Sequence, residues 1–522
     1  MSTATRTVRL GARRVPLVLP NRRDARLHTA AVIISIHIIG ITALGFEVSV
    51  PQILSAIVTA GAIDVAITLR QTGKVVWPAS GMLTGSGVAL ILRLVGTGAG
   101  DYWSWDGWYW FSVIAGFSVL TKYLIRFGGS HVFNPSNIGL VLAFLILGRD
   151  LVEPLDFWWA PIGPWMVLAY VVIIIGGVLI TRRLALLEMA VVFWAVLALG
   201  LGILSASGHC MIATWSPTPV CDGRFWTTVV TSPEVLVFLF FMITDPKTVP
   251  GGRAARVVFA AAIGLLATLL IAPSTTEFGA KVGLLASLAL MSPTQKLFER
   301  AFANVGETSA LRWIGRRLAG AAPAASFTHG LVIGASAVLF SAAVLLAGGA
   351  ARQPAASATS TILPDVEIER ADLPEIEVDA SVRQLDLEVD SGFALDLAAN
   401  LAENLALEAE ALRSANSTIL ASSSGGERLD EMQARLDTAI ATGTRVADVY
   451  TFESLALRLH EAPQGQTSAG LVFAGTGHVD HIRYDAEGDE TGRESEVFDL
   501  DFVLRHLTGE RWVLVGVEPS GT

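Results

Sequence analysis

The sequence predicts a polytopic α-helical membrane protein of about eleven spans, followed by a water-soluble α+β domain. Of its 522 residues, 52% are hydrophobic and only 16% are charged, against roughly 25% charged in an average soluble domain. The charge is also unevenly divided. Residues 1–350 carry 25 Lys and Arg against 15 Asp and Glu, whereas residues 351–522 carry 12 Arg against 32 Asp and Glu. These values exclude a wholly soluble protein, and the acidic tail disfavours nucleic acid as a partner because it would repel phosphates.

The membrane part is expected to contain ten spans and then an eleventh. A bilayer core about 30 Å thick needs about 20 apolar residues. The fifth and tenth stretches are shorter, so we expect them to be tilted, broken or shielded by neighbouring helices. The predicted spans lie near residues 29–46, 52–69, 78–97, 108–124, 135–148, 164–181, 185–205, 229–244, 256–272, 279–292 and 328–349.

Basic residues predict the orientation of these spans. The arm 1–28 holds seven Arg, and the loop 296–327 is also basic. With the N-terminus in the cytoplasm, 21 Lys and Arg fall in cytoplasmic segments and about four lie elsewhere, as the positive-inside rule requires. Cys210 and Cys221 then share one outer loop, where a disulfide can form. Two cysteines are too few for a cysteine-ligated iron–sulfur cluster or an all-cysteine zinc site, and no metal site is predicted.

The first ten spans also suggest an internal repeat. Two halves of five helices each would have opposite orientations, because five is odd, as in many transporters. The third helix of each half opens with small or kinked residues, at Pro78–Gly81 and at Thr231–Glu234. We therefore expect an inverted five-helix repeat.

Three motifs inside the spans contain candidate binding residues, and each also has a purely structural explanation. "SGMLTGSG" begins at Ser80, and its small residues suit either close helix packing or a flat ligand. "FNPSNIG" places a helix cap at Asn134 and a buried amide at Asn137. "ITDPKT" either ends a span or presents a ligand contact at its acidic residue. The candidates are Ser80, Thr84, Asn134, Asn137 and Asp245.

Two acidic residues lie within or next to spans, where ionisable groups are costly and often functional. Asp64 falls in the second span and Glu234 near the start of the eighth. Each is either an ion, proton or cofactor contact or a structural hydrogen-bonding group between helices.

The order and spacing of "SGMLTGSGVALILRL", "GGSHVFNPSNIGLVLAF" and "FFMITDPKTVP" resemble the RnfD/NqrB family, whose members are membrane components of the Rnf electron-transport complex and of the sodium-pumping NADH:quinone oxidoreductase. The resemblance covers residues 29–295. It is stronger to a divergent branch associated with enediyne biosynthesis, the UnbU-like proteins, which share "SPEVLVFLFFMITDPKT". It implies ten spans in a bacterial inner membrane, flavin or quinone as electron carrier, and other electron-transport proteins as partners.

In that family one FMN is joined through its phosphate to a threonine in an outer loop of pattern D-G-x-S/T-G/S-A-T. The resemblance places Asp222, Gly223 and Thr228 at the matching positions of "CDGRFWTTVV". Three bulky residues, 224–226, replace the small ones of the family, so we expect any flavin to be mostly non-covalent. Thr231 and Ser232 begin the next helix and could hold a phosphate at its N-terminus.

The acidic tail is predicted to be a separate domain. Residues 350–363 are rich in small residues and proline and read as a linker. Within residues 364–522, two amphipathic helices are expected over 394–413 and 426–441. Four alternating segments, over 449–460, 468–484, 495–507 and 510–518, are expected to form an antiparallel sheet.

Taken together, the residues and the resemblance predict an electron-transfer protein that passes electrons through flavin or quinone to an extracytoplasmic partner. No catalytic residue is predicted. Two alternatives stay open. The chain could be a non-redox transporter or ion-conducting scaffold of the same inverted-repeat fold, or a membrane anchor for the acidic domain.

Overall fold

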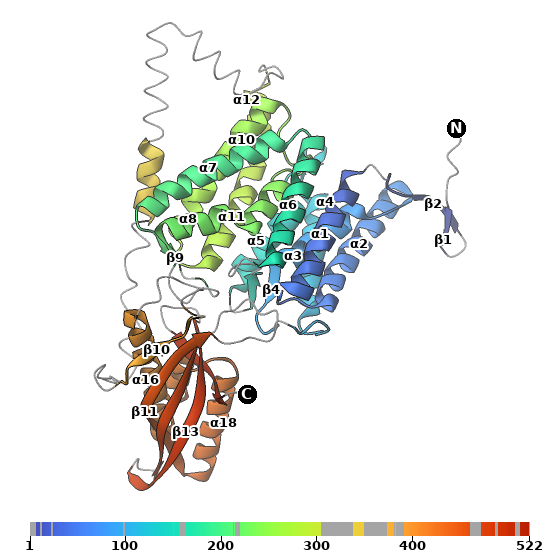
Figure 1. Cartoon of the computed structure of the whole chain (residues 1–522). Coiled ribbons are helices and arrows are strands. Elements are labelled where there is room, and N and C mark those ends of the chain that lie inside the picture. Colours follow the sequence, from blue (N-terminus) through green and yellow to red (C-terminus); the bar gives the residue numbers. More distant parts are fainter. Residues whose placement is uncertain are drawn as a thin grey trace. The chain divides into compact units, whose positions relative to one another are not determined.

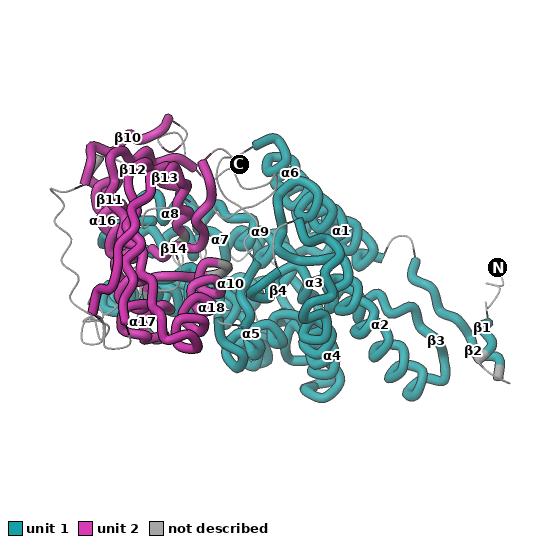
Figure 2. The backbone as a smooth tube through the Cα atoms, turned by 90° about the horizontal axis from the view of Figure 1, so that it is seen from below, with its two compact units in different colours: residues 1–211, 220–353, 464–467 teal, residues 212–219, 354–463, 468–522 magenta. Residues whose placement is uncertain are grey.

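The computed structural model divides the chain into two compact units, shown in different colours in Figure 2. Unit 1 comprises residues 1–211, 220–353 and 464–467, and unit 2 comprises residues 212–219, 354–463 and 468–522. The residues described below are 7–10, 13–21, 24–97, 100–149, 151–155, 163–211, 213, 220–303, 338–348, 373–380, 382, 391–459, 471–485, 489–506 and 512–520. The predicted linker, 350–363, lies outside them, as does most of the basic loop 296–327.

Unit 1 is a bundle of helices packed side by side (Figure 1). Its helices are α1 (Ala25–Ala43), α2 (Val50–Thr72), α3 (Ala79–Ile91), α4 (Trp108–Leu124), α5 (Pro135–Leu147), α6 (Pro164–Arg183), α7 (Leu187–Ala206), α8 (Asp222–Val230), α9 (Pro233–Val237), the π-helix η1 (Phe238–Met242), α10 (Arg253–Ile271), α11 (Glu277–Met291), the 3-10 turn η2 (Ser292–Thr294) and α12 (Gln295–Ala301).

Six helical segments of the described chain are long and apolar enough to cross a membrane, so the protein is membrane-associated. They are α1, α2, α6, α7, the segment from α8 to η1, and α10. Three shorter apolar helices, α3, α5 and Val338–Gly348, coincide with other predicted spans. The helical character of the membrane part is thus confirmed.

Two predicted spans differ from the structure. The third ends at Ile91, because the chain continues as strand β4 (Leu92–Leu94), which pairs antiparallel with β7 (Val152–Pro154). The eighth does not begin near residue 229. It starts at Asp222 as α8, breaks at Thr231 and Ser232, and resumes as α9 and η1.

Short strands flank several helices. β1 (Thr7–Leu10), β2 (Arg13–Val18) and β3 (Val75–Val76) form a three-stranded sheet. β5 (Arg126–Phe127) pairs with β6 (Ser130–His131), and β8 (Cys210–Met211) pairs with β9 (Val220–Cys221). These pairings satisfy backbone groups of the segments between helices.

Unit 2 contains the predicted sheet domain. Its strands are β10 (Ile376–Val378), β11 (Arg445–Leu459), β12 (Leu471–Tyr484), β13 (Glu490–His506) and β14 (Trp512–Pro519), in that spatial order. β10 pairs parallel with β11, and the other pairs are antiparallel. The helices of this unit are α16 (Ser391–Ser414), α17 (Ser417–Ser423) and α18 (Gly426–Thr442). The two predicted helices and four predicted strands are confirmed.

A separate hydrophobic core holds unit 2 together. Leu397 and Leu401 of α16 pack with Leu457, Phe473 and Phe502 from the sheet, and all five are almost fully buried. This core shares no residue with the helices of unit 1, which agrees with the change in composition along the sequence.

Candidate functional site

A cavity of about 460 Å³ in unit 1 is lined by all three motifs. Its walls come from α1, α3, α6, the start of α5 and the segment from α9 through η1 to Lys247. Its volume lies in the range of about 300–1,000 Å³ that is typical of small-molecule sites. Four predicted binding residues line it, namely Ser80, Thr84, Asn134 and Asp245.

Helix α3 has different surroundings on its two faces. Its glycines Gly81 and Gly85 lie against α2, and a Cβ on Gly85 would be only 2.4 Å from the carbonyl oxygen of Ala56. Ser80, Thr84 and Gly87 instead line the cavity. Within the "SGMLTGSG" motif, the residues that pack against α2 are therefore different from those that line the cavity.

The two asparagines of the second motif have different surroundings. Asn134 is the N-cap of α5: its Oδ1 accepts from the backbone N–H of Asn137, and its Nδ2 donates to the carbonyl oxygen of Met242. The side chain of Asn137 donates to the carbonyl oxygen of Leu285 on α11, 3.0 Å away, and does not line the cavity. Asn137 is thus a packing residue, whereas Asn134 joins α5 to η1 at the cavity wall.

One wall of the cavity is a π-helix. The N–H of Ile243 donates to the carbonyl oxygen of Phe238, five residues earlier, and Phe240, Phe241 and Met242 face the cavity. Single π-turns are rare and occur frequently at functional sites. The apolar run "VLVFLFFMI" did not predict this irregularity, because its composition suits a regular helix equally well.

Charged residues from helix ends line the cavity as well. Asp245 Oδ2 lies 3.4 Å from Nε2 of His131, and Arg26 forms a two-point ion pair with Asp24 just before α1. Lys247 also lines the cavity. Arg26 holds the pKa of the Asp24 carboxyl below its usual value through this hydrogen-bonded pair. His131 was not among the predicted binding residues, although it lies three residues before Asn134.

Asp64 of α2 forms hydrogen bonds with two other helices, α3 and α4, next to this cavity. Its Oδ1 accepts from Lys122 Nζ at 2.7 Å and from the hydroxyl of Tyr123, and its Oδ2 accepts from the N–H of Gly81 at 3.1 Å. Lys122 Nζ also lies 3.1 Å from Oγ of Ser80, which lines the cavity. A chain of polar contacts therefore runs from Asp64 to the cavity wall.

Glu234 belongs to a second ionic cluster. Lys281 of α11 lies 2.9 Å from Glu234 and 2.6 Å from Glu277, and all three side chains are at most 16% exposed. Glu234 does not line the cavity. Neither lysine partner was predicted for the two acidic candidates, because each lies more than 40 residues away along the chain.

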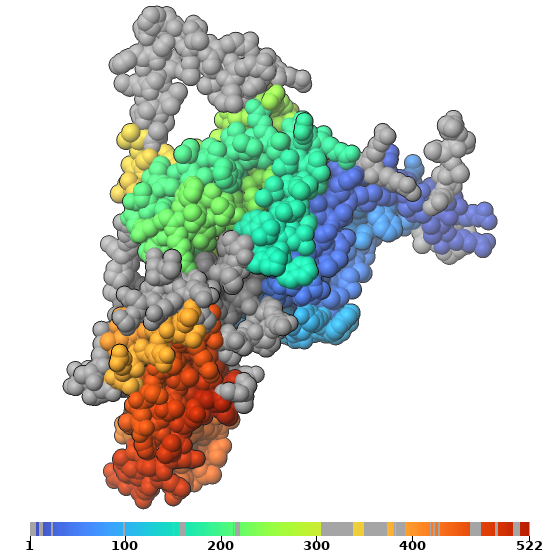
Figure 3. Space-filling model, in the orientation of Figure 1, coloured from blue at the N-terminus to red at the C-terminus, as the bar shows by residue number. Residues whose placement is uncertain are grey.

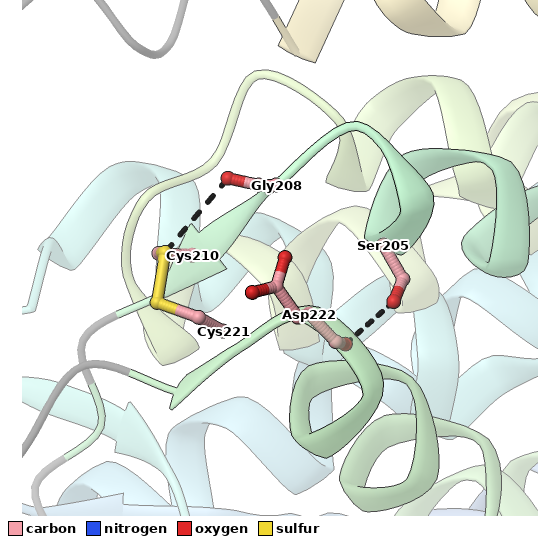
Figure 4. Close-up of a disulfide and its surroundings, with 5 residues drawn as sticks. All are labelled: Ser205, Gly208, Cys210, Cys221 and Asp222. Atoms are coloured by element: carbon pink, nitrogen blue, oxygen red, sulfur yellow. Dashed lines mark hydrogen bonds between the residues drawn. A yellow bond between two sulfur atoms is a disulfide. The ribbon is translucent and has the colours of Figure 1, made fainter. Parts of the chain in front are cut away.

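The two cysteines are joined in the disulfide Cys210–Cys221 (Figure 4). They are opposite residues of the strand pair β8–β9. The next residue, Asp222, has a left-handed backbone with φ of 48°, a conformation that Asp tolerates better than most residues. Ser205 of α7 donates to its carbonyl oxygen. The disulfide thus anchors the start of α8 to the end of α7.

The segment predicted as a flavin-attachment loop is a helix. Asp222, Gly223 and Thr228 all belong to α8, and Thr228 is half-buried in its second turn. At the following break, Ser232 caps α9 by accepting from Val235 N, and Thr231 donates to the carbonyl oxygen of Thr227. None of these residues lines the cavity.

No family model matches the sequence, and no curated protein matches it. What the site can bind is therefore inferred from the residues that line the cavity. Apolar walls are provided by Leu83, Leu90 and Ile91 of α3 and by the rings of Phe240 and Phe241. The hydroxyls of Ser80 and Thr84 and the amide of Asn134 add a few polar groups that can orient a ligand.

Proposed function

We propose that this protein is a membrane electron-transfer component and that its cavity binds a flavin or a quinone. The observation that carries the proposal is the convergence of Ser80, Thr84, Asn134 and Asp245 on one cavity. These residues come from three motifs whose order resembles that of the RnfD/NqrB family. A bound flavin or quinone would supply the redox chemistry, and the protein would supply position and electrostatic environment.

The shape and chemistry of the lining suit a flat, partly polar ring. Gly87 and the small residues of α3 leave room on one side, and Phe240 and Phe241 provide aromatic surface. The Thr84 hydroxyl, which donates to the carbonyl oxygen of Ser80, can accept from a ring N–H, and the second N–H of Asn134 Nδ2 can donate to a ring carbonyl. Lys247 can pair with an anionic end group. These features suit a flavin and a quinone head group alike, and they support a planar redox ring as the proposed ligand class.

The helix packing supports the inverted repeat in this proposal. In the first half α2 packs on α4 and α4 on α5; in the second, α7 packs on α10 and α10 on α11. The equivalent pairs α1–α6 and α5–α11 also meet each other. Two halves with matching contacts are what a pseudo-two-fold arrangement around a central site would produce.

The orientation completes the proposal. We place the N-terminus in the cytoplasm, eleven spans in a bacterial inner membrane, and the acidic sheet domain outside. Electrons would then pass through the cavity ligand toward an extracytoplasmic partner. The positive-inside charge distribution supports this orientation, and the resemblance to the RnfD/NqrB family agrees with a cytoplasmic N-terminus.

Electron transfer can be tested in liposomes of quinone-free lipid with ferricyanide trapped inside and dithionite added outside. We expect liposomes that contain the protein to reduce the trapped ferricyanide faster than protein-free liposomes, and Thr84→Trp, which fills the cavity, to remove the difference. A wild-type rate equal to that of protein-free liposomes would refute electron transfer.

A non-redox ion or proton conductor is the second candidate, and the Asp64–Lys122 pair favours it. Both side chains are buried, at 7% and 12% exposed, within a helical membrane bundle, and such residues often mark ion or proton pathways. The same liposomes distinguish the two functions. A pH-sensitive dye inside them would report proton flux without any added electron donor, and Asp64→Asn would abolish that flux.

A further inference from the structure

The N-terminal arm folds into a small sheet attached to the end of helix α2. β1 and β2 form a hairpin in which Val8 pairs with Val15 and Arg9 with Arg14. β2 then pairs parallel with β3, the strand that follows α2. Figures 1 and 3 show this hairpin, in dark blue, extending away from the helix bundle.

The two faces of this sheet differ in chemistry. Side chains alternate between faces along a strand, and directly paired residues share a face. Val8, Val15 and Leu17 therefore lie on one face together with Val75, which is paired with Leu17. Arg9 and Arg14 lie on the opposite face, and both are exposed. By register Arg13 also falls on the first face, and Val18 with Val76 on the second. The first face is thus mainly aliphatic, whereas Arg9 and Arg14 are the paired cations of the second.

The position of the sheet along α2 sets its depth relative to a membrane. α2 is one of the helices long and apolar enough to cross a bilayer, and it ends at Thr72. β3 begins only three residues later, at Val75. A strand this close to the end of a spanning helix must lie at the membrane surface. Two further exposed cations, Arg70 and Lys74, are found at the same end of α2.

We propose that this sheet lies on the bilayer surface and binds anionic phospholipid head groups. Val8, Val15 and Leu17 would face the acyl chains, while Arg9 and Arg14 bind lipid phosphates. An element that combines a mainly aliphatic face with exposed arginines on the other face has the composition of an interfacial anchor.

The surrounding residues favour a lipid surface over a protein partner. Residues 7–10 and 13–21 contain no acidic side chain, so no internal carboxylate competes for the arginines. The backbone N–H of Trp77 continues the β2–β3 pairing by donating to the carbonyl oxygen of Val18, and the Trp77 side chain is 46% exposed. Exposed Trp next to a spanning helix is typical of the membrane–water interface.

The alternation of side chains gives a sharp test. The native cysteines are joined in a disulfide, so a single introduced cysteine can be labelled selectively with an environment-sensitive fluorophore. Val8→Cys and Thr7→Cys place the label on opposite faces of the same strand. Each full-length variant is reconstituted in nanodiscs of phosphatidylcholine, with or without phosphatidylglycerol, and tested with nitroxide-labelled lipids.

We expect the label at position 8 to show blue-shifted emission and strong quenching by nitroxide lipids in the anionic discs, and the label at position 7 to be quenched less. Adding Arg9→Gln and Arg14→Gln should remove the dependence of the position 8 signal on phosphatidylglycerol. Equal quenching at both positions, or none at either, would overturn the surface orientation. Quenching that ignores lipid charge would overturn head-group binding.

Discussion

Asp64 of α2 and Lys122 of α4 form an ion pair, with Nζ 2.7 Å from Oδ1, in the interior of the helical bundle. The Tyr123 hydroxyl and the Gly81 N–H donate to the same carboxylate, which therefore connects α2, α3 and α4. Because Lys122 also contacts Ser80 at the cavity wall, the pair links helix packing to the candidate site.

Lys122→Met should destabilise the protein by leaving the buried Asp64 charge without its cation. Breaking a buried pair costs about 3–5 kcal/mol, and we expect about 3 kcal/mol because Tyr123 and Gly81 still donate. Adding Asp64→Asn removes the isolated charge, so the double variant should be more stable than Lys122→Met alone. Unfolding in mixed micelles, followed by circular dichroism, measures both. A double variant less stable than Lys122→Met would contradict this account.

Gly85→Ala should loosen the contact between α2 and α3. Its Cβ would lie 2.4 Å from a backbone oxygen, that of Ala56, which cannot move without shifting α2. Overpacking of this kind costs about 1–3 kcal/mol. Gly202→Ala is a matched control on α7, since its Cβ would meet Trp226 at an ordinary 3.5 Å. In detergent, the thermal unfolding midpoint of Gly85→Ala should be lower than that of Gly202→Ala. Equal midpoints would show that the close contact between α2 and α3 at Gly85 does not limit stability.

The Cys210–Cys221 disulfide should form only if its loop faces an oxidising compartment. In cells precipitated with acid and then dissolved in denaturing detergent, neither cysteine should react with a maleimide–polyethylene glycol reagent until a reductant is added, whereas Cys210→Ser should leave Cys221 reactive. With a sequence separation of 11 residues, loss of the bridge should cost about 3 kcal/mol. Labelling of both cysteines without reductant would place this loop in the cytoplasm and reverse the proposed orientation.

Tyr450 should titrate far above an ordinary tyrosine. Burial raises its pKa from 10.0 to about 12, and the nearby Asp448 charge acts in the same direction. Since the folded-state pKa is the higher one, the resulting stability is complete below pH 10 and is lost as the pH rises through about 12. The tyrosinate absorbance of wild type minus Tyr450→Phe gives this midpoint directly. A midpoint near 10 would mean that Tyr450 is solvated.

The sequence predicted the elements whose signal is local. The helices of unit 1 follow from long apolar runs, and the strands of unit 2 from the alternation of side chains over residues 445–519. Asn134 was predicted as a cap because Pro135 follows it, and it does cap α5.

The sequence did not predict contacts between distant segments, or where a helix departs from regular α-helical geometry. Lys122 was counted only as a positive charge near a helix end, because its pairing with Asp64 depends on how α2 and α4 pack. The π-turn at Phe238–Met242 and the strand that shortens α3 are set by tertiary partners. Likewise, the helix at Thr228 overrides a motif that was expected to be a loop.

The measurement that tests the central claim most directly is the redox difference spectrum of the purified full-length protein, taken before and after dithionite and again after air. We predict a reversible change at the absorption band of a flavin or quinone. The change should be lost in Thr84→Trp and retained in Thr228→Ala. After denaturation the cofactor should separate from the polypeptide, because we expect it to be non-covalent. A monodisperse, folded wild-type protein with no reversible absorption change would contradict the proposal, as would a cofactor that depends on Thr228 and not on Thr84.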